Sequence, residues 1–246
     1  MTKKEILNII NRMINQGKKY KWSKRIKDID YFKKQNINNI TGYGIYEYEY
    51  DTEPKNRFCL YIKLGNSNKN NNTNKSLTVL LMNPSNTFPK DIAKQKKCKP
   101  GFDQTIRNLI TFANEKEYNQ IVVLNTFPYI ESDSKKANKH YKDNKNEKPN
   151  KLNKKFVEKI INNSKEVLVA YGSNIDEDLH NEYLELLKNI KKEKKDIKLY
   201  TYASELTKGR SPRPRHFSQQ SYNNIKNPAL YELKIVEKYQ YQIQAP

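Results

Sequence analysis

Four short apolar runs, separated by amphipathic helix-like sequence, constrain the fold of this chain more than any other feature. The runs are LTVLLM at 77–82, IVVL at 121–124, VLVAYG at 167–172 and IKLYTY at 197–202. Each has the length of a buried strand and is rich in branched side chains. Between them, apolar residues recur at helical spacing around Leu109, Ile160 and Leu186. Strands alternating with helices predict a parallel sheet with right-handed crossovers.

We therefore expect an α/β fold with three layers, α/β/α, around a central four-stranded parallel sheet. This main domain spans 77–246 and contains a polar surface insertion at 131–150. Residues 1–76 are expected to hold an N-terminal helix, a basic segment and a β-hairpin, which pack on the main domain or extend it. A last helix is expected from Asn227-Pro228 towards Lys238, because proline is common in the first turn of a helix.

Local signals define the N-terminal elements. Thr2 and Glu5 have the spacing of a capping box, which predicts that a helix begins there. The β-rich stretches YGIYEYEY (43–50) and RFCLYIKL (57–64) flank a turn with Asp51 and Pro54, so they read as a hairpin.

The charge of the chain favours a polyanionic partner. Its 246 residues include 47 Lys and Arg against 27 Asp and Glu, a formal net charge of +20. Such a charge attracts DNA, RNA or an anionic membrane. The alternative is a compositional bias, since the chain is also rich in Asn and Ile.

Several classes of protein are not expected. No stretch has the apolar length of a membrane span and no signal peptide opens the chain, so we expect a cytoplasmic protein without membrane contact. Cys59 and Cys98 have no metal-type spacing and the chain has three histidines, so neither a metal site nor another cofactor is expected.

Polar residues follow each predicted strand. In a parallel α/β sheet, ligands bind at the carboxyl ends of the strands. The residues at these exits are Asn83-Pro84-Ser85, Asn125-Thr126-Phe127, Ser173-Asn174 and the stretch from Arg213 to Ser218. The pattern indicates a binding site at this edge of the sheet.

The order of these motifs resembles the uracil-DNA-glycosylase superfamily. The resemblance implies that Asn83, in LLMNPSNTF, positions the attacking water, and that Asn125, in VLNTF, reads the base edge. It implies that His216 hydrogen-bonds the departing base and that Phe88 stacks on it. Tyr129 is assigned to base binding with them.

The same resemblance implies a set of DNA contacts. Serine hydroxyls and backbone N–H groups at helix starts are suited to phosphate oxygens, and Tyr171-Gly172-Ser173 matches the family's third strand exit. Arginines clustered in the late loop are expected to grip the backbone. The residues assigned to DNA binding are Ser85, Arg107, Ser173, Arg210, Arg213, Arg215 and Ser218.

A closer resemblance is to a bacterial domain family of unknown function, DUF1643, over roughly 77–218. The matching pieces are Met82-Asn83-Pro84-Ser85, Asp103-Gln104-Thr105-Ile106-Arg107, Asn125 and Pro214-Arg215-His216. Each piece is short and weak alone, but the four pieces in this order indicate the family more specifically.

These resemblances imply a monomeric DNA glycosylase-like enzyme that flips a base out of DNA and hydrolyses its N-glycosidic bond. Asn83 stands where the most active glycosylases have an acid, and Leu81 stands where a glycine is usual, so a modified base is a better candidate than uracil. Repair and defence against phage both fit this activity. The alternatives are a binding module without catalysis on the same fold and an enzyme acting on free nucleotides.

Each site residue also has a plainer interpretation. Asn83-Pro84 fits a simple turn, Asn125 fits a cap, and His216 fits a hydrogen-bonding residue without a chemical role. Asp103 is expected to be the N-cap of the helix through Ile106 rather than a catalytic acid. Arg107 fits an ion pair with Asp103 as well as a DNA contact.

Overall fold

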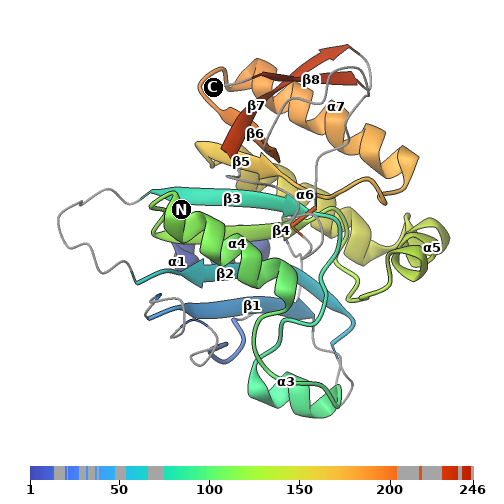
Figure 1. Cartoon of the computed structure of the whole chain (residues 1–246). Coiled ribbons are helices and arrows are strands. Elements are labelled where there is room, and N and C mark those ends of the chain that lie inside the picture. Colours follow the sequence, from blue (N-terminus) through green and yellow to red (C-terminus); the bar gives the residue numbers. More distant parts are fainter. Residues whose placement is uncertain are drawn as a thin grey trace.

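The computed structural model describes residues 1–13, 20, 22–27, 32, 37, 39–47, 54–65, 75–203, 216–217, 229–237 and 240–244. Within this part of the chain, eight strands form one sheet in the order β1-β2-β4-β3-β5-β6-β7-β8 (Figure 1). The strands are β1 (Thr41–Glu47), β2 (Asn56–Lys63), β3 (Ser76–Leu81), β4 (Gln120–Asn125), β5 (Glu166–Val169), β6 (Lys198–Ala203), β7 (Ala229–Glu237) and β8 (Gln240–Gln244).

The centre of the sheet is parallel and its flanks are antiparallel. β4, β3, β5 and β6 pair in parallel, and they correspond to the four apolar runs. On one side β2 pairs antiparallel with β4 and carries β1, as the predicted hairpin. On the other side β7 pairs antiparallel with β6 and carries β8. The fold is mixed α/β, and the sheet is wider than the four strands predicted.

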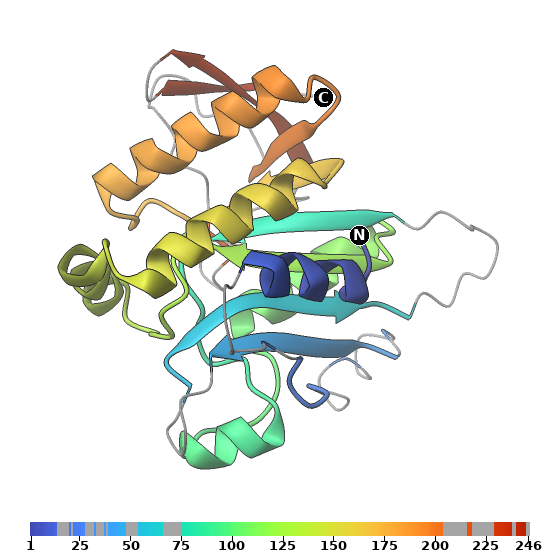
Figure 2. The ribbon, with the colours of Figure 1, turned by 180° about the vertical axis from the view of Figure 1, so that it is seen from behind.

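Helices cover both faces of the sheet. The described helices are α1 (Lys3–Met13), α3 (Lys90–Gln95), α4 (Gln104–Glu115), α5 (Ser134–Asn144), α6 (Lys148–Asn162) and α7 (Glu177–Glu193). In Figure 1, α4 lies in front of the sheet. Seen from behind, α1, α6 and α7 lie across the opposite face (Figure 2). The sheet is therefore the middle of three layers.

Alternation along the strands builds a core on each face. Val79 and Val123 belong to the core that contains the apolar face of α4. Their neighbours Leu80 and Leu124 belong to the core that contains the apolar faces of α1, α6 and α7. Because successive side chains of a strand point to opposite faces, the central strands are apolar throughout.

The N-terminal signals are confirmed. The Thr2 backbone N–H donates to Glu5 Oε2 at 2.6 Å, and the Glu5 N–H donates to Thr2 Oγ1 at 3.3 Å. These two bonds form the predicted capping box, and Ile6 and Ile10 of α1 are fully buried. The insertion at 131–150 folds as α5 and the start of α6, and α5 buries Ala137 and Tyr141.

The prediction of a last helix at 227–238 is wrong, because this segment contains strand β7. Leu230 pairs with Tyr202, and Glu232 pairs with Tyr200 of β6. Tyr231, Leu233 and Ile235 alternate with other residues at the period of a strand. The unpaired edge of β6 offers hydrogen bonds to such a segment, and this tertiary pairing overrides the proline signal.

Candidate functional site

The chain leaves the central strands towards different faces of the sheet. The connection that follows β3 leads to α4 on one face, while the connections after β4 and β5 lead to α6 and α7 on the other (Figures 1 and 2). β4 and β5 are the two neighbours of β3. At such a switch point an open α/β sheet has a crevice outside the carboxyl ends of its strands, where ligands bind.

Asn125, the last residue of β4, has a buried side-chain amide. Its side chain is 0% exposed, and neither Nδ2 nor Oδ1 has a partner among the described residues. By alternation from Val123 the side chain lies on the α4 face. A buried polar group is nearly always hydrogen-bonded, and an exception calls for an explanation such as a ligand. If Asn125 capped the following segment, its side chain would accept a backbone N–H there, and no such hydrogen bond is formed with the described residues.

The backbone that carries Asn125 is held from the opposite face. Asn153 of α6 donates from Nδ2 to the Asn125 carbonyl oxygen at 2.9 Å. The Tyr183 hydroxyl of α7 donates to the Thr126 carbonyl oxygen at 2.7 Å. The Thr126 hydroxyl donates to the Met82 carbonyl oxygen at 2.6 Å and ties the exits of β4 and β3 together.

Asn83 follows β3 at the same edge and is half-buried. Its amide nitrogen donates to the carbonyl oxygens of Pro84, at 3.1 Å, and of Glu131. The Glu131 N–H in turn donates to the Pro84 carbonyl oxygen at 3.0 Å. With its nitrogen used in this way, Asn83 presents its amide oxygen as the group that can accept a hydrogen bond from a water or ligand.

Asp103 is the N-cap of α4, as predicted, and it does more than cap. Its Oδ1 accepts from the Ile106 N–H at 3.0 Å. Its Oδ2 accepts from the hydroxyls of Ser85 and Thr87, both at 2.7 Å. The loop after β3 is thereby fixed to the N-terminus of α4.

His216 is half-buried and packs against the end of β5. Gly172 has a φ of +84°, and a Cβ at this position would lie 2.9 Å from His216 Cβ. The next residue is anchored to α4, because Asn108 Nδ2 donates to the Phe217 carbonyl oxygen at 3.0 Å and the Phe217 ring packs on Phe112. Burial lowers the pKa of His216, and the negative charge of Asp103 opposes this shift.

Asn83, Asn125 and His216 therefore lie at the exits of β3, β4 and β5, three adjacent strands. Neighbouring strands are about 4.8 Å apart, so β4 and β5 are separated by roughly 10 Å across β3.

Two predicted base-binding residues have other surroundings. Phe88 is 0% exposed in a small cluster with Tyr46, Ile92 and Ala93, so in this conformation its ring presents no free face for stacking. Tyr129 stacks on His140, with ring centroids 3.5 Å apart and an interplanar angle of 13°.

The predicted DNA contacts are spread over the site and beyond it. The Ser85 hydroxyl donates to Asp103, and Ser173 is exposed just after Gly172. Arg107 is half-buried in the first turns of α4. Arg210, Arg213, Arg215 and Ser218 lie outside the described residues.

Sequence reasoning missed a buried cation at this edge. Arg57, the second residue of β2, is 1% exposed, and its Nη1 donates to the Thr87 carbonyl oxygen at 2.9 Å. The same oxygen accepts from the Tyr46 hydroxyl at 2.8 Å. Thr87 thus links Arg57 to Asp103. A single arginine at the start of an apolar strand gives no sign in the sequence of whether it is buried.

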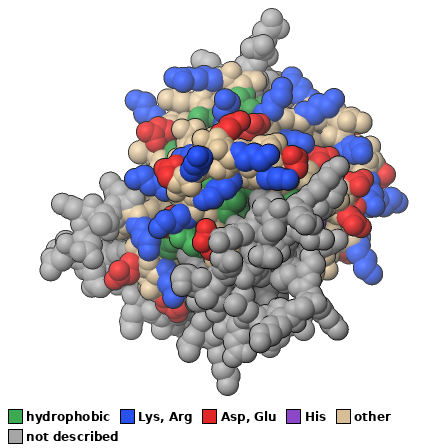
Figure 3. Space-filling view, turned by 90° about the horizontal axis from the view of Figure 1, so that it is seen from above, with side chains coloured by type: hydrophobic (Ala, Val, Ile, Leu, Met, Phe, Trp, Pro, Cys, Tyr) green, Lys and Arg blue, Asp and Glu red, His purple; other side chains and the backbone are tan. Residues whose placement is uncertain are grey.

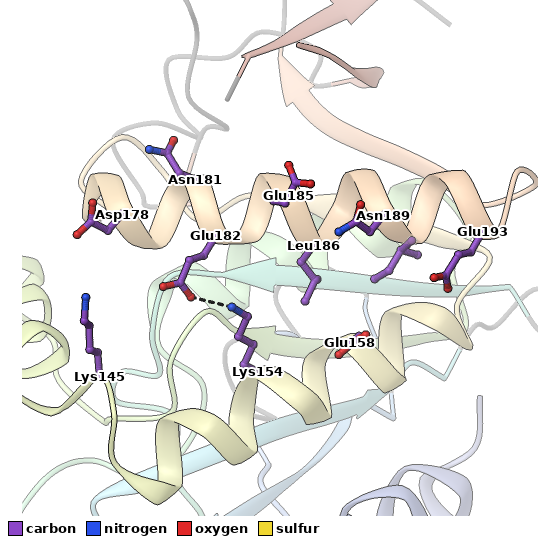
Figure 4. A pocket seen from close by; sticks show the side chains of 11 residues that line it. Lys145, Lys154, Glu158, Asp178, Asn181, Glu182, Glu185, Leu186, Asn189 and Glu193 are labelled. Carbon is purple, nitrogen blue, oxygen red and sulfur yellow. Dashed lines mark hydrogen bonds and ion pairs between the residues drawn. The ribbon is translucent and has the colours of Figure 1, made fainter. Parts of the chain in front are cut away.

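The described part of the face in Figure 3 does not present one unbroken basic field. Seen from above, the described face carries Lys and Arg side chains interspersed with Asp and Glu (Figure 3). A groove of about 580 Å³ lies between α6 and α7 (Figure 4). It is lined by more acids than lysines, and Lys154 is paired with Glu182 at 2.9 Å. This groove is therefore poorly suited to phosphates.

A second cavity, of about 320 Å³, reaches Thr126 from the same side as the groove. Within the described residues, no group of three or more His, Cys, Asp or Glu side chains is placed to hold a metal ion. No helix in this part of the chain combines the length and apolarity needed to cross a bilayer.

A family model described as "Protein of unknown function (DUF1643)" matches residues 57–216. The chain belongs to this family. The DUF1643 region begins at Arg57 and ends at His216, so it includes all the strand-end residues described above, while α1, β1, β7 and β8 lie outside it. No curated protein and no solved structure matches the chain.

Proposed function

We propose that this protein is a DNA glycosylase-like enzyme that flips a base out of DNA and hydrolyses its N-glycosidic bond. The observation that carries the proposal is the fully buried amide of Asn125 at the carboxyl end of β4, which has no hydrogen-bond partner among the residues that the structure describes. An asparagine presents one donor and one acceptor side by side, which matches the paired groups on a base edge. Leaving both unpaired costs stability, and this cost is repaid when a base occupies the site.

The other residues of the edge suit the chemistry. The oxygen of a water molecule forms a bond to C1′ of the sugar while the C1′–N bond breaks, its electron pair goes to the base, and the water proton ends on the base or in solvent. In this proposal the Asn83 amide oxygen accepts a hydrogen bond from that water, because the amide nitrogen already donates to Pro84 and Glu131. His216 donates to an oxygen of the base as negative charge develops there.

The substrate class follows from Asn83. An amide orients water but cannot take its proton. The reaction rate then depends more on how readily the base leaves. A base whose modification makes it a better leaving group suits such a site better than plain uracil. The resemblance to the uracil-DNA-glycosylase superfamily and the net charge of +20 support DNA as the partner. Repair and anti-phage defence remain the two proposed roles.

The test is a screen for base release. The protein is incubated with single- and double-stranded oligonucleotides that carry deaminated, alkylated or otherwise modified bases, and alkali-labile abasic sites are measured. We expect Asn125→Ala to abolish release while salt-dependent DNA binding stays nearly unchanged. Asn163→Ala, an exposed asparagine just after α6, is the matched control and should retain activity. No abasic product with any base from the folded wild-type protein would rule out the proposal.

A second candidate is a binding module that recognises a base without releasing it. The hydrogen bonds of Asn83 to two backbone carbonyl oxygens favour it, because they give this residue a structural role at the turn. This candidate predicts salt-sensitive binding without base release, and binding that tolerates Asn83→Ala.

A further inference from the structure

The cavity of about 320 Å³ lies where α5, α6 and α7 meet behind the end of β4. Tyr141 of α5, Lys151 of α6 and Tyr183 of α7 line it, and it reaches Thr126 just after β4. The side chain of Asn125 lies on the opposite face of the sheet, among the residues that pack with α4. The cavity is therefore separate from the proposed base site.

The charges that line this cavity are positive in sum. Three lysines, Lys145, Lys151 and Lys154, face one glutamate, Glu182, which gives a net charge of +2. Glu182 is paired with Lys154 at 2.9 Å (Figure 4). Within the described part of the chain, Lys145 and Lys151 form no ion pair. The neighbouring groove has five carboxylates against two lysines, so the cavity and the groove differ in the sign of their charge.

Tyr141 brings an unused hydroxyl to the cavity. The residue is 5% exposed, and its ring packs on Phe127 with ring centroids 5.5 Å apart. The Tyr141 hydroxyl forms no hydrogen bond with the described residues, whereas the Tyr183 hydroxyl donates to the Thr126 carbonyl oxygen. Burial raises the pKa of Tyr141, so this hydroxyl stays a donor at neutral pH. A buried donor without a partner in the wall of a cavity points to a ligand that accepts its hydrogen bond.

Helix α6 begins at the rim of the cavity. Asn150 and Lys151 in its first turn line the cavity, and the exposed N-cap residue Glu147 forms no side-chain cap hydrogen bond. Asn150 Nδ2 donates to the Asn144 carbonyl oxygen at 2.8 Å and fixes the turn that carries Lys145. The positive end of the α6 dipole thus adds to the two lysines in attracting an anion.

Three carboxylates act on Tyr141 and would oppose an anion beside it: Glu182, Asp176 and Asp178. Glu182 is neutralised by its lysine, and Asp176 is paired with Lys142 at 2.9 Å. Asp178 is exposed, so solvent and salt screen its charge. The lysines of the rim therefore outweigh the carboxylates around the cavity.

We propose that this cavity binds a phosphate group, either as the free anion or as part of a small molecule such as a nucleoside monophosphate. Lys145 and Lys151 hold the phosphate at the exposed rim, and the Tyr141 hydroxyl donates from the buried wall. The volume lies at the lower end of the range for small-molecule sites, about 300–1,000 Å³. The site goes beyond the proposed function and does not depend on it.

The test is titration calorimetry of the full-length protein with thymidine 5′-monophosphate and with inorganic phosphate. Lys151→Ala should weaken binding roughly tenfold or more, because a charged hydrogen bond is lost. Tyr141→Phe should also weaken binding but leave the Tm of the free protein unchanged. Lys155→Ala, an exposed lysine of α6 outside the cavity, is the matched control and should bind as the wild type does. Glu182→Gln should tighten binding, since it releases Lys154 for the ligand.

The two probes separate the sources of the phosphate. Equal affinity for both supports a site for the free anion, and tighter binding of the nucleotide supports a nucleoside monophosphate. Binding of neither probe, or equal binding by the wild type and Lys151→Ala, would overturn the inference. Displacement of thymidine monophosphate by an oligonucleotide without a terminal phosphate would also overturn it, because the cavity would then hold the DNA backbone. None of these measurements involves base release, so failure of the proposed function leaves their outcome unaffected.

Discussion

Replacing Asn125 with leucine should stabilise the free protein while it abolishes base recognition. Leucine has nearly the shape of asparagine and no polar atoms, and the site is 0% exposed. A buried polar group without a partner costs about 1–3 kcal/mol, and Asn125→Leu removes this cost. For a chain of this size, each kcal/mol shifts the melting temperature by about 2–4 °C. The expected rise in Tm is therefore roughly 2–12 °C.

Asn108→Leu is the matched comparison. Asn108 is also buried, at 5% exposed, but both of its amide atoms are paired: Nδ2 donates to the Phe217 carbonyl oxygen and Oδ1 accepts from Gln104 Nε2 at 2.8 Å. Its replacement leaves these partners unpaired and should lower stability by about 1–3 kcal/mol. The two variants thus differ in sign although the substitution is the same.

Calorimetry and urea unfolding of the three proteins, with no nucleic acid present, measure this difference. An oligonucleotide with the recognised base should stabilise Asn125→Leu less than the wild type, because the contacts to the DNA backbone remain while the contact to the base is lost. If Asn125→Leu lowers Tm as Asn108→Leu does, the Asn125 amide is satisfied in the free protein. The reasoning that assigns it to a ligand would then fail.

Two further predictions concern His216. Gly172→Ala should destabilise the protein by about 1–2 kcal/mol, because a residue with a Cβ is strained at a φ of +84° and its Cβ would press on His216. Denaturant unfolding measures the loss of stability. An unchanged unfolding midpoint would contradict the close contact. The free energy of unfolding should also decrease as the pH is lowered from 7.5 to 5.5. Burial lowers the pKa of His216 and His140 below the ordinary 6.5, so the unfolded chain binds protons at a higher pH than the folded protein does. The urea midpoint should show this slope and His216→Gln should flatten it, whereas a midpoint that rises on acidification would show the sign to be wrong.

Local sequence patterns predict the elements whose structure depends on neighbouring residues. Branched runs at 77–82 and 121–124 form strands, and the capping box at Thr2 begins a helix, because these signals need few long-range contacts. Local periodicity does not predict the strand Ala229–Glu237, because its structure depends on pairing with the edge of β6, which is distant in the sequence.

The site shows the same division. Asn83 and Asn125 could be placed at strand exits, since the carboxyl ends of parallel strands share one edge. His216, expected after the strand at 197–202, packs against Gly172 at the β5 exit instead. The surroundings of Phe88 depend on how α3 packs on Tyr46, and those of Tyr129 on where α5 brings His140. The second role of Asp103 depends on hydroxyls from another loop, and no spacing in the sequence indicates it.

Asn153 and Tyr183 fix the backbone at the end of β4, whereas the side chain of residue 125 is the group that faces a ligand in the proposed site. Both residues grip backbone oxygen atoms from the α6 and α7 side, so the position of residue 125 does not depend on the chemistry of its own side chain. A substitution there changes what is recognised without moving the scaffold. Under the proposed function, the preference for one base over another can therefore be changed by substitution at position 125 alone, and an engineer who wants a new specificity should vary this position first.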